Sequence, residues 1–173
     1  MRIMKYAGVF LAAVILITIG CDYRAPLTEE HTIAVDRAVL GLWEEVPKGD
    51  KPPNPDERML ILHYSDTEYL IHYPAGKDGL FFRGYPIKVG GIPCVKIELI
   101  ARYDGDPGKE DKRYQVVRYA LSKGILEVRT LNTDLVARDL QDGAGLRQAF
   151  LKNKDNKDLF HDPGRFRKIN EQR

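Results

Sequence analysis

The stretch from Glu57 to Asn132 is a succession of short β-rich runs separated by turn sequences, and it limits the fold more than any other feature of the chain. Two runs flank Ser65-Asp66-Thr67, two flank Gly90-Gly91, and two flank Ser122-Lys123-Gly124. Runs joined by such short connections pair as antiparallel hairpins. The sequence therefore predicts an antiparallel meander, either closed into a single β-barrel or folded as an open β-sandwich.

The first hairpin carries enough apolar residues for its register to be predicted. We assume that Ser65 pairs with Glu68 across the turn. Because side chains alternate along a strand, this pairing sorts the hairpin into one apolar face and one mixed face. The mixed face would carry both His63 and His72. The predicted apolar face consists of Leu60, Leu62, Tyr64, Tyr69, Ile71 and Tyr73.

The period of the apolar residues changes after the meander. From Leu146 onward they follow a helical spacing, and Asp142 can accept hydrogen bonds as the N-cap. These signals predict one short amphipathic helix over about 145–153. A last strand is expected over Arg165–Ile169. The fold class is therefore mainly β, with a short C-terminal helix.

An apolar run from Tyr6 to Gly20 precedes the β-rich region. It follows the basic residues Arg2 and Lys5 and ends at Cys21. As a helix it would be roughly 22 Å long at ~1.5 Å per residue, shorter than the ~30 Å hydrocarbon core of a bilayer. This layout is typical of a cleaved secretory signal rather than of a spanning helix.

The end of this run, Thr18-Ile19-Gly20-Cys21, resembles the lipobox of bacterial lipoproteins. The resemblance implies removal of residues 1–20 as a signal peptide, a diacylglycerol on the Cys21 sulfur and an acylated amine. The partner would be a membrane of the cell envelope, on the side facing the periplasm or exterior, and Asp22 favours the inner membrane. An ordinary signal or an uncleaved anchor remains open. Residues 21–32 are expected to be a tether, and residues 33–173 one domain.

The net charge and the cysteine content further limit which partners the chain could bind. Removal of the signal lowers the number of Lys and Arg residues from 27 to 25, which equals the number of Asp and Glu residues. A neutral domain argues against nucleic-acid binding and against a polybasic membrane contact. If Cys21 carries lipid, Cys94 is expected to be a small buried residue. A disulfide between the two cysteines requires that lipidation does not occur.

Gly41-Leu42-Trp43 opens the first predicted strand and contains the only tryptophan. A short helical turn is predicted just before it, over Ile33–Leu40. This arrangement resembles the Gly-x-Trp signature of lipocalins and the wider calycin group. The resemblance favours a small barrel over a sandwich. It implies structural roles for Gly41 and Trp43, with Arg165 or Arg167 lying over the indole ring. The simpler reading is that Trp43 is only the largest core residue.

Aromatic residues are frequent in the predicted sheet, and a barrel could use them to line a cavity for one small apolar molecule. The alternative is a core filled by the same rings. His63 and His72 could share a metal ion, but zinc needs at least a third protein ligand, so no metal site is predicted. The candidate ligand-binding residues are Tyr64, Tyr69, Tyr73 and Phe82.

The sequence contains no motif that assembles catalytic chemistry. It lacks a glycine-rich phosphate loop, a nucleophile elbow and a helical His-Glu-x-x-His. No enzymatic activity and no cofactor are therefore predicted. Two functions remain: a membrane-tethered module that binds an apolar small molecule or an envelope partner, and a structural or interaction lipoprotein with a filled core.

Overall fold

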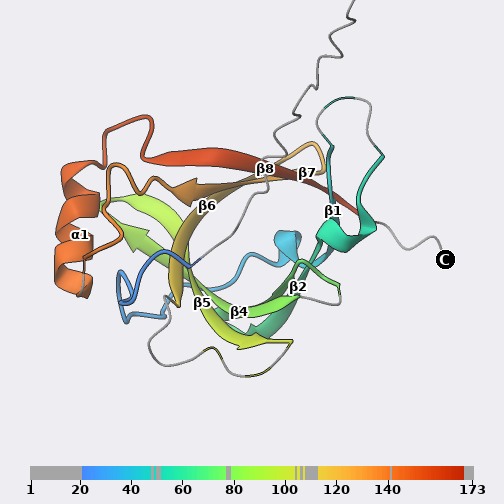
Figure 1. Ribbon diagram of the computed structural model, residues 1–173, viewed down its shortest axis with the longest axis horizontal. Helices are drawn as coiled ribbons and strands as arrows, with labels where there is room; N and C mark the ends of the chain where they lie inside the picture. The colour runs from blue at the N-terminus through green and yellow to red at the C-terminus, as the bar shows by residue number, and fades with distance from the viewer. Residues whose placement is uncertain are drawn as a thin grey trace, which may run out of the picture.

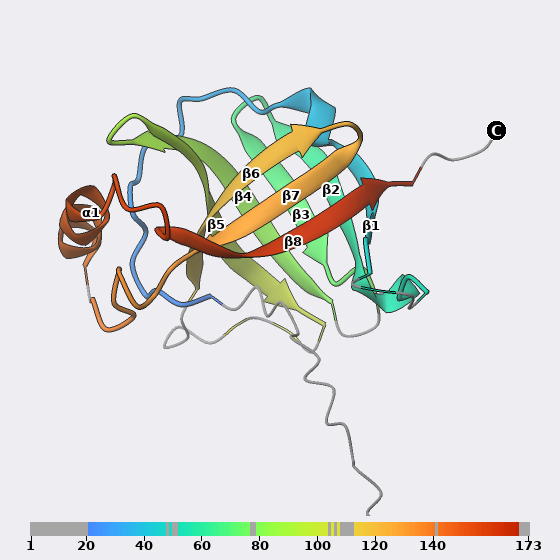
Figure 2. The same ribbon diagram turned by 90° about the horizontal axis from the view of Figure 1, so that it is seen from above.

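The computed structural model describes residues 21–47, 49, 52–76, 79–103, 105, 107, 113–140 and 142–169. Within these residues, eight antiparallel strands form a closed barrel (Figures 1 and 2). Each strand pairs with its neighbour in the sequence, and β1 pairs with β8. The predicted antiparallel barrel is confirmed, and the open sandwich is wrong. The strands are β1 (Gly41–Glu45), β2 (Arg58–Ser65), β3 (Glu68–Tyr73), β4 (Leu80–Val89), β5 (Ile92–Arg102), β6 (Tyr114–Ser122), β7 (Ile125–Leu131) and β8 (Phe160–Lys168).

The predicted C-terminal helix is present as α1 (Gly143–Lys152), between β7 and β8. It is capped as expected, since the Asp142 Oδ1 accepts a hydrogen bond from the Gly145 N–H at 2.7 Å. Two short 3₁₀ turns precede β1 and β2. They are η1 (Arg37–Val39), where the sequence predicts a helical turn, and η2 (Pro55–Glu57).

β8 begins at Phe160, before the predicted start at Arg165. The strand contains Pro163, which has no N–H to donate to a neighbouring strand. Its ladder with β7 shifts register at this point, and Asp162 adopts a φ of 48°. A bulge of this kind accommodates the proline without ending the strand.

The β2–β3 hairpin differs from the predicted register. Ser65 pairs with Glu68 as expected, but the ladder shifts between His63 and Ser65, so Ile61 pairs with Ile71. One extra residue in β2 moves its side chains to the other face. The residues Met59 and Ile61 therefore face inward, while Leu60, Leu62 and Tyr64 face outward.

The buried side chains form two clusters. The inner cluster fills the barrel and includes Trp43 and Phe82, each 1 % exposed. The outer cluster lies between α1 and the outer surface of β4, β5 and β6. Cys94 belongs to the outer cluster and is 5 % exposed, which agrees with its expected burial. Both cysteines are free thiols.

Residues 22–31, which we call the N-terminal strap, lie along the barrel wall instead of forming a free tether. Tyr23 is fully buried and Leu27 is 2 % exposed. The backbone of Tyr23 pairs with Tyr114 of β6 as an isolated antiparallel bridge. The outer cluster explains this course, because Tyr23 and Leu27 complete its cover at a place that α1 leaves open.

The barrel has two unlike ends. The capped end carries η1 and the β2–β3 and β6–β7 turns, and the Val35 N–H donates to the Asp66 carbonyl there at 2.9 Å. The loop end carries the last residues of β1, β3 and β5 and the first residues of β2, β4 and β6. Figure 2 shows η1 at the upper edge of the barrel and the start of the N-terminal strap at the lower edge.

The buried contact of Tyr23 provides a test of how firmly the N-terminal strap is held. The Tyr23 hydroxyl donates to the Val136 carbonyl at 2.8 Å, and Val136 is fully buried. Tyr23→Phe leaves that carbonyl without its partner and should lower the free energy of unfolding by about 1–3 kcal/mol. Urea denaturation measures the change. Tyr103→Phe is the matched control, because Tyr103 is 71 % exposed and should unfold like the parent. Equal stability of all three proteins would contradict the packing of the strap.

Candidate functional site

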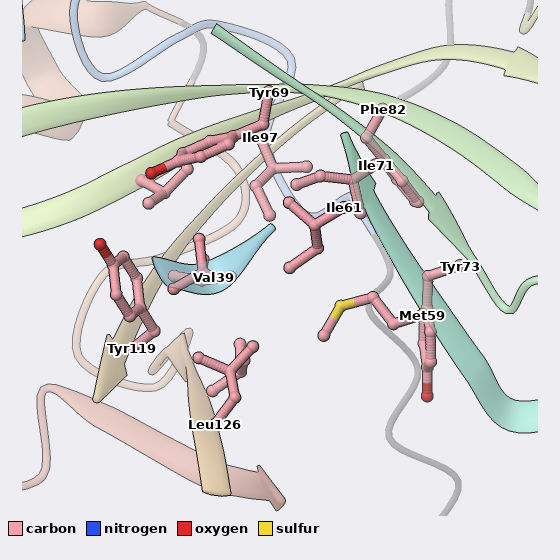
Figure 3. Close-up of a pocket in the computed structure, with 13 residues that line it drawn as sticks. Val39, Met59, Ile61, Tyr69, Ile71, Tyr73, Phe82, Ile97, Tyr119 and Leu126 are labelled. Carbon is pink, nitrogen blue, oxygen red and sulfur yellow. The ribbon is translucent and has the colours of Figure 1, made fainter. Parts of the chain in front are cut away.

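The inside of the barrel contains an apolar cavity that could be a ligand site (Figure 3). Its volume is about 50 Å³. Tyr69, Tyr73 and Phe82, three of the four predicted ligand-binding residues, line it. The fourth, Tyr64, does not, because the β2 bulge turns it outward, where it is 57 % exposed. The other lining residues are Val39, Met59, Ile61, Ile71, Val95, Ile97, Val117, Tyr119, Leu126 and Val128.

The cavity is too small for the ligand that the sequence suggested. Sites for drug-sized molecules measure about 300–1,000 Å³. Figure 3 shows the lining side chains, from Val39 of η1 to Tyr73, converging on the space between them. The barrel core is therefore essentially filled by its own side chains.

The capped end of the cavity is closed by a polar clasp. The Asp36 N–H donates to the Tyr69 hydroxyl at 2.6 Å, and the Tyr119 hydroxyl donates to the Asp36 carboxylate at 3.3 Å. Burial raises the pKa of both tyrosines, so both remain protonated at neutral pH. These bonds fix η1 over the end of the barrel and engage the hydroxyls of Tyr69 and Tyr119.

Trp43 is a structural residue at the closure between β1 and β8. Its indole Nε1 donates to the Val39 carbonyl at 2.9 Å, and the Lys168 Nζ lies 5.4 Å from the ring centroid. The prediction that Arg165 or Arg167 covers the ring is wrong, and Arg165 is exposed to solvent. Arg167 pairs with Glu44 on the outer surface at 2.6 Å, because Trp43 faces Lys168 in the β1–β8 register.

Gly41 fits the conformation that the chain adopts next to this closure. Its φ of +126° lies in a region that residues with a side chain rarely adopt. A Cβ atom at this position would also lie 3.0 Å from the Lys168 Cε. A larger residue at the start of β1 would therefore strain the backbone and displace the Lys168 side chain that lies over the indole ring.

The outer surface of β1–β4 carries a second candidate site, which we call the outer apolar face. The register places Leu42 beside Leu60, and Leu62 beside Leu70. Leu62 is 43 % exposed, and Phe81 extends the face across β4, where its ring stacks on His72 at 4.2 Å between centroids. A continuous exposed apolar surface is typical of an interaction site.

Tyr64 stands at the edge of the outer apolar face. The Arg83 guanidinium lies 4.8 Å from its ring centroid and forms an ion pair with Glu68. An aromatic ring with a cation above it combines apolar area with charge, and both side chains are frequent in protein interfaces.

The two histidines of the hairpin are not brought together. His63 pairs with Tyr69 and His72 with Leu60, so they lie on opposite faces. Within the part of the chain that the structure describes, no group of three His, Cys, Asp or Glu residues could hold a metal ion.

A buried lysine for which the sequence contains no signal lies under the N-terminal strap. Lys96 is 2 % exposed, although it points outward from β5. Its Nζ donates to the Thr28 carbonyl at 3.2 Å and to the His31 Nε2 at 2.7 Å, and lies 4.4 Å from the Tyr85 ring centroid. Burial lowers the pKa of Lys96. The lysine thus joins the strap to the barrel wall.

Cys21, the predicted lipidation site, lies at the loop end and packs against the edge of the inner cluster. Burial, opposed by a hydrogen bond from the Leu99 backbone, raises the pKa of its thiol to about 12. A free thiol with this pKa is a weak nucleophile at neutral pH. The predicted signal peptide, residues 1–20, lies outside the described residues. Among the described residues, no helix is long and apolar enough to cross a bilayer.

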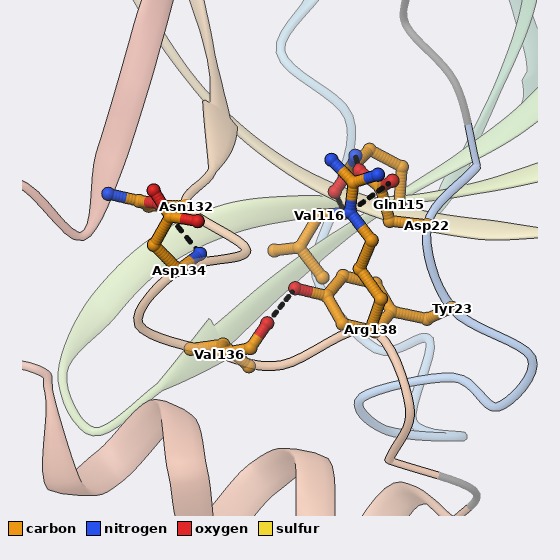
Figure 4. Close-up of polar contacts among 8 residues, drawn as sticks. All are labelled: Asp22, Tyr23, Gln115, Val116, Asn132, Asp134, Val136 and Arg138. Atoms are coloured by element: carbon orange, nitrogen blue, oxygen red, sulfur yellow. Dashed lines mark hydrogen bonds and ion pairs between the residues drawn. The ribbon is translucent and has the colours of Figure 1, made fainter.

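The residue after Cys21 is held by polar contacts (Figure 4). The Asp22 N–H donates to the Tyr114 carbonyl at 3.0 Å. Its carboxylate accepts from the Gln115 Nε2 at 2.6 Å and pairs with the Arg138 Nε at 3.2 Å. Asp22 therefore has a structural role in the fold.

Comparison with known proteins gives no match. No family model fits the chain, no curated protein is similar to it, and no solved structure matches it.

The contact between Lys96 and His31 predicts an acid-sensitive fold. Burial and the charge of Lys96 lower the pKa of His31 below 6.5, and burial lowers that of His72. Neighbouring Glu68 and Glu29 oppose this effect on His31, and Arg83 adds to it. The folded protein thus holds fewer protons on these rings than the unfolded chain does. Stability is complete above the unfolded pKa and decreases as the pH falls through the lowered values.

We therefore expect the melting temperature to fall between about pH 7.5 and about pH 5. His31→Gln keeps an acceptor for Lys96 but does not titrate, so this variant should lose less stability on acidification. Thermal unfolding at several pH values measures the difference. If His31→Gln loses as much stability as the parent protein, His31 does not contribute to the acid sensitivity.

Proposed function

We propose that this chain is a lipid-anchored protein of the bacterial cell envelope whose barrel binds another envelope protein. The observation that carries the choice of partner is the filled core. A cavity of about 50 Å³ gives no room for a carried apolar molecule, whereas the outer apolar face is open to solvent.

The anchor rests on the lipobox-like sequence that ends at Cys21. Lipidation would give this cysteine a role that its chemistry as a free thiol does not supply, since burial holds its pKa at about 12. Two acyl chains are enough to hold a protein stably on a membrane. The side of the membrane would be the periplasmic or exterior one, and Asp22 favours the inner membrane.

The protein-binding role is supported by the chemistry of the outer apolar face. Its leucines flank Tyr64 and Arg83, two residue types that are enriched at interfaces. The apolar part of the β4–β6 wall, formed by Ile87, Val89, Cys94 and Val116, is covered by α1 and the N-terminal strap, so it offers less apolar surface to a partner. No set of nucleophile, base and orienting group occurs among the described residues that line the cavity, so a catalytic role has no support there.

The proposed anchor predicts the mass of the mature protein and the effect of a substitution at Cys21 on membrane attachment. The mature protein should begin at Cys21 and carry the mass of a diacylglycerol. Cys21→Ala should release the protein from the membrane fraction. Cys94→Ala is the matched control, because Cys94 is buried in the outer cluster and should leave membrane attachment unchanged. An unmodified Cys21, or an intact Met1, would overturn the anchor.

The choice between a protein partner and a small ligand can be tested on the purified protein and in cells. Native mass spectrometry should detect the lipidated chain without a bound small molecule. A photo-crosslinking residue at Leu62 should yield one defined protein adduct, whereas the same residue at exposed Arg118 of β6 should not. A stoichiometric apolar molecule in the native spectrum, without an adduct at Leu62, would favour the ligand-binding alternative.

A further inference from the structure

The N-terminal strap leaves no flexible segment between the proposed lipid and the barrel. Tyr23, two residues after the proposed lipidation site, is fully buried. Its N–H donates to the Tyr114 carbonyl, and its own carbonyl accepts from the Arg113 and Tyr114 N–H groups, each at 3.0 Å. A free tether of about twelve residues would instead allow a separation of roughly 20 Å between lipid and domain.

The position of Cys21 determines which part of the barrel lies closest to the lipid. The next residue, Asp22, donates its N–H to the carbonyl of Tyr114, the first residue of β6, and Cys21 itself packs against the inner cluster. Because Tyr114 pairs with Glu98, Cys21 lies beside the last residues of β5 and the start of β6. These residues belong to the loop end. η1 and the β2–β3 turn lie at the opposite end (Figure 2).

The loop end also carries the most exposed large apolar side chain of the described residues. Tyr103 follows directly after β5 and is 71 % exposed. Tyrosine is enriched at the level of lipid headgroups, where the ring contacts apolar matter and the hydroxyl stays in water. A tyrosine next to Arg102 at this end is therefore suited to a bilayer surface.

We infer that the barrel docks with its loop end against the bilayer surface, with Tyr103 at the headgroup level and the capped end pointing away. This inference rests on the proposed lipidation of Cys21. The rigid attachment through Asp22 and Tyr23 sets the orientation, and Tyr103 adds a contact to it. The outer apolar face then stands on the side of the anchored barrel, open to a partner in the same membrane.

The orientation can be measured by fluorescence quenching in the full-length lipidated protein. Vesicles of phosphatidylcholine with brominated acyl chains quench tryptophans near the bilayer. We compare Tyr103→Trp at the loop end with Leu121→Trp at the capped end, where Leu121 is 38 % exposed. Trp43 is 1 % exposed. Its fluorescence is measured in the parent protein and subtracted from that of each variant. The added emission should be quenched at least about twofold more in Tyr103→Trp, as expected for a headgroup-level side chain. Equal quenching would overturn the orientation.

A linker insertion separates this inference from the proposed anchor. Insertion of about twelve Gly and Ser residues between Cys21 and Asp22 gives the domain a reach of roughly 20 Å. The lipid mass and vesicle binding should be retained, while the quenching difference falls toward onefold. If the difference persists, the attachment at Cys21 does not set the orientation. If the parent chain lacks the lipid mass, the proposed anchor itself is wrong.

Discussion

The pairing of β1 with β8 is the interaction on which the rest of the structure depends. It places Trp43 opposite Lys168 and Glu44 opposite Arg167, so one register both buries the indole and forms an ion pair outside. A closed sheet has no edge strands, so another chain cannot add to it by strand pairing. Interactions of the barrel must therefore use side-chain surfaces, and its small cavity leaves the outer wall and the two ends for this purpose.

Features that depend on neighbouring residues could be predicted from the sequence. The Gly90-Gly91 turn, the Asp142 cap and the antiparallel meander each have local signals, and the structure confirms them. The β2 bulge has no such signal. It turns Tyr64 outward to a position under the guanidinium of Arg83, a residue of β4 that the local pattern of the hairpin does not include. One inserted residue therefore exchanged the inner and outer residues of β2, and with them part of the predicted ligand site.

The N-terminal strap could not be predicted from the sequence for a related reason. Its polar composition indicates a tether, but two buried apolar side chains, Tyr23 and Leu27, hold it against the outer cluster. The strap in turn buries Lys96, whose Nζ hydrogen-bonds to Thr28 and His31 of the strap. A buried lysine without partners would be strongly destabilising, so the strap and the wall require each other.

The contacts that hold the strap on the barrel wall also limit how a barrel with a lipid at position 21 could be oriented. On a flexible tether, a lipid would confine the barrel near the membrane and leave its orientation free. On the rigid strap, a lipid would hold one end of the barrel against the bilayer. α1 and the strap already cover the wall formed by β4–β6. The outer apolar face of β1–β4 is then an apolar surface that neither element covers, and a partner of the anchored protein would approach it from within the plane of the membrane.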